Sequence, residues 1–297
     1  MTNKVAVVER NVVDNVANRV KEFQASGDLV FPENYIPENA LRSAHLVLQE
    51  TLDRSKVPVL QSCSTASIAN SLLSMVVQGL NPDKAQCYFI AYGKTLQLQR
   101  SYFGDMHVAK TVDPTIKDIY GKVIYEGDEL DYEIKHGKEI IKSHTQAFGN
   151  IDKTKIIGAY ATVLYEDGTE LSTIMTIEQI KQSWIMSGMK PVDEKGNIKE
   201  YSTHGKFTAD MAEKTAIRKA CKYIINSSSD KGIVAKFAKE VSSDIAEAET
   251  KMIIEENANT EYLDFDEDTG EIFDTEDEVI EEESEVVEEE PEESPGY

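Results

Sequence analysis

Charge is distributed very unevenly along this 297-residue chain, and this asymmetry limits how much of it can fold into a packed body. From Asp244 to the end, 24 Asp and Glu accompany a single basic residue, Lys251. Residues 1–243 hold 30 acidic and 30 basic side chains, so the entire formal net charge of −23 belongs to the C-terminal segment. A segment this charged does not bury enough apolar surface to offset its loss of conformational entropy. The sequence therefore predicts a neutral folded body, followed by a disordered acidic tail over residues 244–297.

The composition also limits the compartment of the chain and the role of its cysteines. The N-terminal apolar run Val5–Val8 is broken by Glu9, and no apolar stretch approaches the roughly 20 residues of a membrane span. Three cysteines, Cys63, Cys87 and Cys221, stand far apart without the paired spacing of a zinc site or a disulfide framework. We expect a cytoplasmic protein with no membrane association and with free, buried thiols. The sequence is compatible with three roles for the tail: a solubilising appendage, a docking arm for a partner, or a DNA mimic.

The hydrophobic pattern divides the body into two regions. Residues 1–80 carry apolar side chains at helical spacing, which predicts a helix over 11–25, a second after Pro37, and a third capped by Ser64 or Thr65 and ended by Gly79. From Gln86 the period changes to two, and strands are predicted over 122–136, 156–165 and 170–176, with helices over 177–187 and 208–225. We expect the α+β class: a mainly helical N-terminal region, residues 1–80, and an α+β core, residues 81–243.

The tripeptide Gly93-Lys94-Thr95 resembles the end of a phosphate-binding loop, but its surroundings exclude one. Such a loop needs a glycine five residues earlier, where this chain has Tyr88. Gly93-Lys94 instead predicts the turn of a hairpin that pairs Tyr92 with Thr95 and Tyr88 with Gln99. The apolar face of this hairpin is expected in the core, and its other face is aromatic and amide-bearing.

Metal-dependent nuclease chemistry finds little support in the sequence. The five histidines are scattered, without an HExxH or similar spacing. Asp105, Asp128 and Asp131 are more simply explained as turn and helix positions than as ligands of a shared ion. We expect no metal and no cofactor.

The sequence has two clusters of cations, and aromatic groups accompany the first. In the first, Arg100, Tyr102 and Lys110 follow the hairpin; cations suit backbone phosphates, and rings suit base stacking. The second lies on the helix predicted from Thr208, where Lys214, Arg218 and Lys222 recur at four-residue spacing, with Lys219 beside them and Lys206 before the helix. On this helix the residues expected to pack inward are Met211, Ala212, Thr215, Ala216, Ala220 and Tyr223. An ordinary solvated helix face is the alternative explanation of the second cluster.

The segments "GLNPDKAQCYFIAYGKTLQLQRSYFG" and "DMAEKTAIRKACKYI", together with "QSCSTASIANSLLSMVVQGL" and Tyr-Glu-Gly-Asp at 125–128, resemble the RecT family of phage single-strand annealing proteins over about residues 35–226. The resemblance implies a recombinase that anneals complementary strands without ATP, acts as a ring or helical filament, and has a fold distantly related to the Rad52 type. It assigns DNA binding and oligomerisation to the core, residues 81–243, and implies no catalytic residue, because annealing makes no covalent bond. It implies as partners single-stranded DNA and an annealed duplex intermediate, a phage exonuclease and a host single-strand-binding protein. The DNA contacts that it implies are Gln97, Arg100, Tyr102, Lys110, Lys206, Lys214, Arg218, Lys219 and Lys222.

Three other functions compete with annealing as explanations of the sequence. A passive protein that coats single strands would need the same basic groove, and the sequence separates it poorly from an annealing protein. A metal-dependent nuclease lacks its ligand spacing. An acidic scaffold of the histone-chaperone kind would rest on the tail alone and leaves both basic clusters unexplained.

Overall fold

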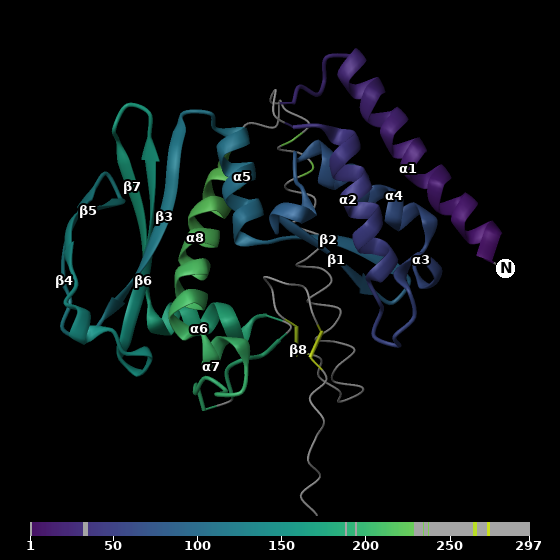
Figure 1. Cartoon of the computed structure of the whole chain (residues 1–297). Helices are drawn as coiled ribbons and strands as arrows, with labels where there is room; N and C mark the ends of the chain where they lie inside the picture. Colours follow the sequence, from purple (N-terminus) through teal and green to yellow (C-terminus); the bar gives the residue numbers. More distant parts are fainter. Residues whose placement is uncertain are drawn as a thin grey trace, which may run out of the picture.

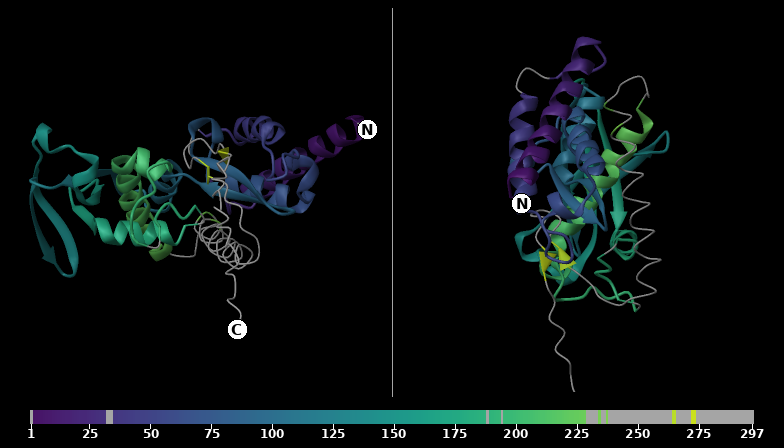
Figure 2. Two further views of the ribbon diagram at one scale, coloured as in Figure 1. Left: turned by 90° about the horizontal axis from the view of Figure 1, so that it is seen from below. Right: turned by 90° about the vertical axis from the view of Figure 1, so that its right-hand side faces the viewer.

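The computed structural model describes residues 2–31, 35–187, 189–193 and 195–228, together with residues 234, 237, 264–265 and 272–273. In these parts the chain forms N-terminal helices with a two-stranded hairpin, and an antiparallel sheet with its own helices (Figure 1). The N-terminal helix and strands β4 and β5 lie at opposite ends of an elongated molecule (Figure 2). The predicted α+β class is confirmed.

The N-terminal region contains helices α1 (Thr2–Ala25), α2 (Pro37–Glu50), α3 (Val59–Ser62) and α4 (Thr65–Val77). All three predicted helices are present, and α3 is an additional short one. The Ser64 hydroxyl accepts a hydrogen bond from the Ser67 amide, which is the predicted cap of α4. Helix α4 ends at Val77, two residues before Gly79. Leu41, Leu48 and Leu72 are almost fully buried where these helices pack together.

A short 3-10 helix, η1 (Pro82–Lys84), leads into the hairpin of β1 (Cys87–Tyr92) and β2 (Thr95–Arg100). The predicted register is confirmed from Tyr92–Thr95 to Tyr88–Gln99, and Gly93 has the positive φ of 59° that the turn requires. The hairpin rests on α4: Leu96 donates its amide hydrogen to the Ser67 hydroxyl and accepts a hydrogen bond from the Ser71 hydroxyl. The hairpin therefore packs against the helices of the N-terminal region, although it belongs to the predicted core, residues 81–243. The predicted boundary between these two regions stays a prediction.

The main sheet has five antiparallel strands in the order β3-β6-β7-β5-β4. Their bounds are β3 Ile116–Tyr125, β4 Glu129–Lys135, β5 Lys138–Thr145, β6 Ile156–Tyr165 and β7 Glu170–Thr176. The predictions for β6 and β7 are confirmed. The single strand predicted over 122–136 is wrong, because a turn at 126–128 divides it into β3 and β4. Strand β5 was not predicted; it meets β7 through the Glu139–Ser172 pair, and the Glu139 carboxylate accepts the Ile174 amide hydrogen at 2.6 Å.

The remaining elements are the helices α5 (Tyr102–Val112), α6 (Ile177–Ile185), α7 (Thr203–Lys206) and α8 (Thr208–Ser227), with the 3-10 turns η2 (Phe148–Asn150) and η3 (Lys153–Lys155). Helix α8 covers one face of the sheet against β3 and β6, and α5 packs on α8 (Figure 1). Met211, Ala212, Ala216 and Ala220 of α8 are buried as expected. Tyr223 is instead 72% exposed, because Ile224 and Ile225 take the buried positions of that turn.

Most of the acidic tail lies outside the described residues, and so does the predicted disorder there. Its described parts are β8 (Asp264–Phe265) and β9 (Ile272–Phe273), which pair antiparallel. Cys63, Cys87 and Cys221 are free and buried, as predicted. Among the described helices, none combines the length and the apolar character that crossing a membrane would require.

Candidate nucleic-acid interface

Helix α5 carries Tyr102 and Lys110 of the first predicted cluster, and Ser101 fixes where this helix begins. The Ser101 hydroxyl accepts a hydrogen bond from the Gly104 amide and donates one to the Ala85 carbonyl at 2.6 Å. The cap therefore ties the start of α5 to the segment before β1. Gly104 permits this close approach, since a Cβ atom at its position would lie 2.0 Å from the Gln86 carbonyl oxygen. The side chains of Tyr102 and Phe103 leave α5 directly after this anchored cap.

Two aromatic rings and a cation lie together where α5 meets α8. The rings of Tyr102 and Phe103 lie 4.0 Å apart between centroids, with planes tilted by 33°. The Lys214 ammonium of α8 lies 5.5 Å from the centroid of the Tyr102 ring, within the range of a cation–π interaction. Phe103 is 46% exposed. Two segments more than 100 residues apart in sequence thus present a cation beside two rings. Proteins that bind single strands use this arrangement, with the cation for phosphates and the rings for bases.

The cations of α8 extend this surface along the helix. Arg218 and Lys222 follow Lys214 at one-turn intervals; Lys214 and Arg218 are half-buried, and Lys222 is exposed. Lys219 is exposed next to Arg218, and Lys206 is exposed at the end of α7, just before α8 begins. Trp184 of α6 donates its indole hydrogen to the Thr215 hydroxyl at 2.8 Å and so fixes α8 from its other side. We call Tyr102, Phe103, Lys214, Arg218 and Lys222 the α5–α8 track.

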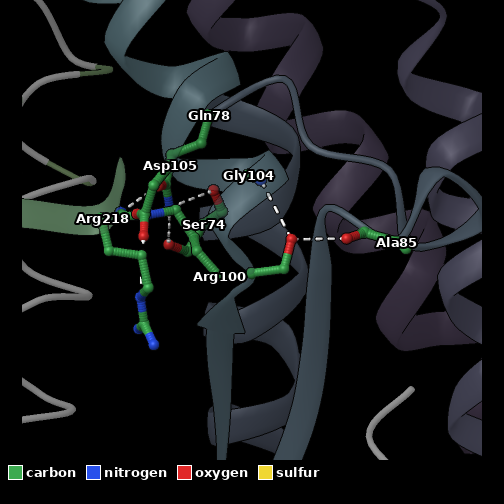
Figure 3. Close-up of polar contacts among 8 residues, drawn as sticks. Ser74, Gln78, Ala85, Arg100, Gly104, Asp105 and Arg218 are labelled. Atoms are coloured by element: carbon green, nitrogen blue, oxygen red, sulfur yellow. Dashed lines mark hydrogen bonds and ion pairs between the residues drawn. The ribbon is translucent and has the colours of Figure 1, made fainter. Parts of the chain in front are cut away.

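Arg100 does not belong to this surface. Its side chain is 6% exposed, and its Nε lies 2.7 Å from Asp105 Oδ1. Its Nη1 donates to Gln78 Oε1 at 2.7 Å, and Gln78 Nε2 donates in turn to the Ser74 hydroxyl and carbonyl. Figure 3 shows these groups converging between α4, β2 and α5. The sequence predicts Arg100 as a DNA contact, but in this structure the hydrogen bonds of its guanidinium hold it inside the protein.

Arg218 connects the buried cluster to the track. Its Nε lies 3.4 Å from Asp105 Oδ2, while Asp105 Oδ1 is bonded to Arg100 (Figure 3). One carboxylate thus joins β2, α5 and α8. Arg218 therefore shares its carboxylate partner with the buried Arg100, and this contact orients the Arg218 guanidinium.

Two further predicted residues lie away from the centre of the track. Lys110 is near the end of α5, with its Nζ 3.0 Å from Asp118 Oδ1 of β3, and the hydrogen bond from Lys110 lowers the pKa of Asp118. Gln97 lies in β2 opposite Ile90, and its Oε1 is buried without a hydrogen-bond partner among the described residues. The structure therefore brings Lys214 to Tyr102 and places Arg218 and Lys222 along the same helix. Lys110 lies further along α5 and lines a pocket together with Phe103, whereas Gln97 lies apart in the hairpin.

Two acidic residues of α8, Asp210 and Glu213, lie near Tyr102 and reduce the positive charge at that end of the track. Burial raises the pKa of Tyr102, and the charges of Glu213 and Asp210 raise it further, so the phenol stays protonated and can donate a hydrogen bond. Burial also raises the pKa of Glu213, which the nearby Lys122 opposes. These acids precede Lys214 on α8, so the basic character is strongest toward Arg218 and Lys222.

Asp128, in the Tyr-Glu-Gly-Asp segment, organises a separate polar cluster. Its carboxylate accepts hydrogen bonds from the Tyr125 amide, Gln146 Nε2 and Asn150 Nδ2, and it lies 3.3 Å from His144 Nε2. The cluster fastens the turn between β3 and β4 to the end of β5. Among the described residues, no group of three or more His, Cys, Asp or Glu side chains is arranged to hold a metal ion. We therefore assign Asp128 a structural role.

Sequence reasoning missed Phe103. Its signal was its place beside Tyr102 in "RSYFG", but its exposure follows from the helix that starts at Tyr102, and that helix is not among the predicted elements.

Comparison with known families gives one result that fits this geometry. The model of the RecT family matches residues 38–261, which span both α5 and α8. A search of curated proteins finds no match. The matched region covers about three quarters of the chain, so the chain belongs to the RecT family, the proteins of single-strand annealing in phage-type DNA recombination.

Proposed function

We propose that this protein binds single-stranded DNA along the α5–α8 track and pairs it with a complementary strand without ATP. The observation that carries the proposal is the position of the Lys214 ammonium over the Tyr102 ring, with the Phe103 ring beside it. In this arrangement the cations Lys214, Arg218 and Lys222 take phosphates, while the two rings offer faces on which any base can stack. Contacts of this kind bind without reading the base edges, as annealing of arbitrary sequences requires.

The position of the Gly93-Lys94 segment supports the independence from ATP. It forms the tip of the β1–β2 hairpin, where β2 follows at once. A phosphate loop is followed by a helix, whose N-terminus holds the nucleotide phosphates. Pairing in our proposal draws only on the free energy of the base pairs that form.

Family membership also supports a set of partners. We propose that copies assemble as rings or helical filaments that align their tracks on one strand, and that the oligomer holds the annealed duplex intermediate. A phage exonuclease would supply the single strands, and a host single-strand-binding protein would deliver or compete for them.

The test is the pairing rate of two labelled complementary oligonucleotides in buffer that contains a chelator and no nucleotide. We expect the protein to accelerate pairing and the double variant Lys214→Ala/Lys222→Ala to lose most of that acceleration. Lys138→Ala is the matched control, because Lys138 is exposed at the β4–β5 turn, away from the track. Tight binding without acceleration would favour a passive coating protein. A strict need for ATP, or loss of DNA when magnesium is added, would contradict the proposal.

A further inference from the structure

A pocket of about 300 Å³ opens beside the track, between η1 and one face of α5. Four of its lining residues come from α5 at the spacing of one helix face, and the others come from η1 and the segment before β1. The lining residues are Lys84, Gln86, Phe103, Met106, His107 and Lys110. Its volume is at the lower end of the range for small-molecule sites, so the pocket has room for one flat ring system but not for several stacked rings.

The walls of the pocket combine an aromatic ring, a thioether and a neutral imidazole. Phe103 is 46% exposed and Met106 is half-buried. Burial lowers the pKa of His107, and the charge of Lys84 lowers it further, against a hydrogen bond to the Gly79 backbone. His107 is therefore uncharged at neutral pH and adds to the ring surface.

Charge lies at two ends of the pocket rather than within it. Lys84 is exposed at the η1 end, and Lys110 comes from the far end of the α5 face, where Asp118 also contacts it. The six lining residues include no carboxylate. Ring surfaces between two cations suit a planar heterocycle that carries phosphate on either side. A purely apolar ligand would make no use of the lysines, and a bare anion would make no use of Phe103 and Met106.

Phe103 belongs both to the pocket and to the track. Its ring contacts Tyr102, which lies beneath Lys214, and its side chain also lines the pocket. Building on the function proposed above, we infer that the pocket receives one unpaired base of the bound strand, stacked on Phe103, while Lys84 and Lys110 bind the flanking phosphates. The pocket thus separates one base from its neighbours, and that base leaves the pocket when its complement arrives.

The inference is tested with two strands of equal length, one of thymidines and one with abasic sites throughout, bound at the same salt concentration and followed by fluorescence anisotropy. We expect the wild type to prefer the thymidine strand. Phe103→Ala should weaken binding of the thymidine strand by about tenfold, in the range of one lost stacking contact, and leave abasic binding unchanged. Phe148→Ala is the matched control, because Phe148 is 90% exposed and lies outside both surfaces.

Phe103→Leu retains apolar volume without a planar ring, so it should show the same selective loss if stacking is the cause. Equal affinity of Phe103→Ala and the wild type for the thymidine strand would overturn the inference and remove Phe103 from the stacking surface, while strand binding by Lys214, Arg218, Lys222 and Tyr102 would stand. A loss of the same size on both strands would also overturn it, since the effect would not depend on a base. If the wild type bound neither strand, the proposed function would fail, and the pocket assignment with it.

Discussion

Arg100 Nε lies 2.7 Å from Asp105 Oδ1 inside the protein, and this ion pair joins the hairpin to α5. The bonds from Arg100 to Gln78 and from Asp105 to Arg218 extend it to α4 and α8. A buried charge that loses its partner is strongly destabilising, because its desolvation is no longer compensated. The cluster therefore couples the N-terminal helices to the elements that carry the track.

Replacing Arg100 by alanine should lower the free energy of unfolding by about 3–5 kcal/mol. Urea denaturation followed by circular dichroism measures this, with the exposed Arg42→Ala as the control, expected within about 0.5 kcal/mol of the wild type. A variant of normal stability that bound single strands more weakly would instead support Arg100 as the direct DNA contact that the sequence predicted.

Gly104→Ala should also destabilise the protein, for a steric reason. The new Cβ would lie 2.0 Å from the Gln86 carbonyl oxygen, a backbone atom that cannot rotate away. Overpacking of this kind costs about 1–3 kcal/mol. Thermal unfolding of Gly104→Ala should therefore begin at a clearly lower temperature than that of Gly149→Ala, where the space around the new methyl group is open. Equal melting temperatures would mean that the start of α5 can shift without cost.

The sequence predicted the elements whose pattern is local, and it failed where tertiary contacts decide. The hairpin register follows from Gly93-Lys94 and the alternation of its strands, so it was predicted to the residue. Strand β5 has little apolar alternation, and its place depends on pairing with β4 and on Glu139. The sequence pattern presents Arg100 as a cation available to DNA, because the burial of its pair with Asp105 depends on Gln78, 22 residues away, and sequence alone does not show that α4 packs there. Lys214 and Tyr102 were both named, but their contact follows from the packing of α5 on α8.

Asp128 should make stability depend on pH in the acid range. Burial raises its pKa, but hydrogen bonds from Gln146, the Tyr125 amide, Asn150 and His144 outweigh burial and lower it to about 2. Because the folded-state pKa lies below the unfolded value, this stabilisation is present above about pH 4 and is lost as the pH falls toward 2. The difference in urea midpoint between wild type and Asp128→Asn should therefore shrink across that window. A difference that stayed constant from pH 5 to pH 2 would contradict the assigned charge state.

The track should give binding of single strands a measurable salt dependence. Each phosphate contact on a single strand contributes about 0.7 to the slope of log affinity against log salt. Lys214→Ala and Lys222→Ala should each flatten that slope by about this amount without changing base preference. Slopes equal to that of the wild type, in variants that remain folded, would show that these lysines form an ordinary solvated helix face.

Truncation after Ser243 should strengthen binding of single strands. The segment removed carries the entire net charge of the chain, so it can compete with DNA phosphates for the cations of α8 at a high effective concentration. Screening shortens the reach of this competition to about 8 Å at physiological ionic strength, so the gain should be largest at low salt and fade as salt is added. Titration of a labelled oligonucleotide into full-length and truncated protein at two salt concentrations measures the gain. Unchanged affinity at both would leave the docking arm and the solubilising appendage as the remaining roles. Loss of recombination in cells, with the affinity of the purified protein unchanged, would select the docking arm.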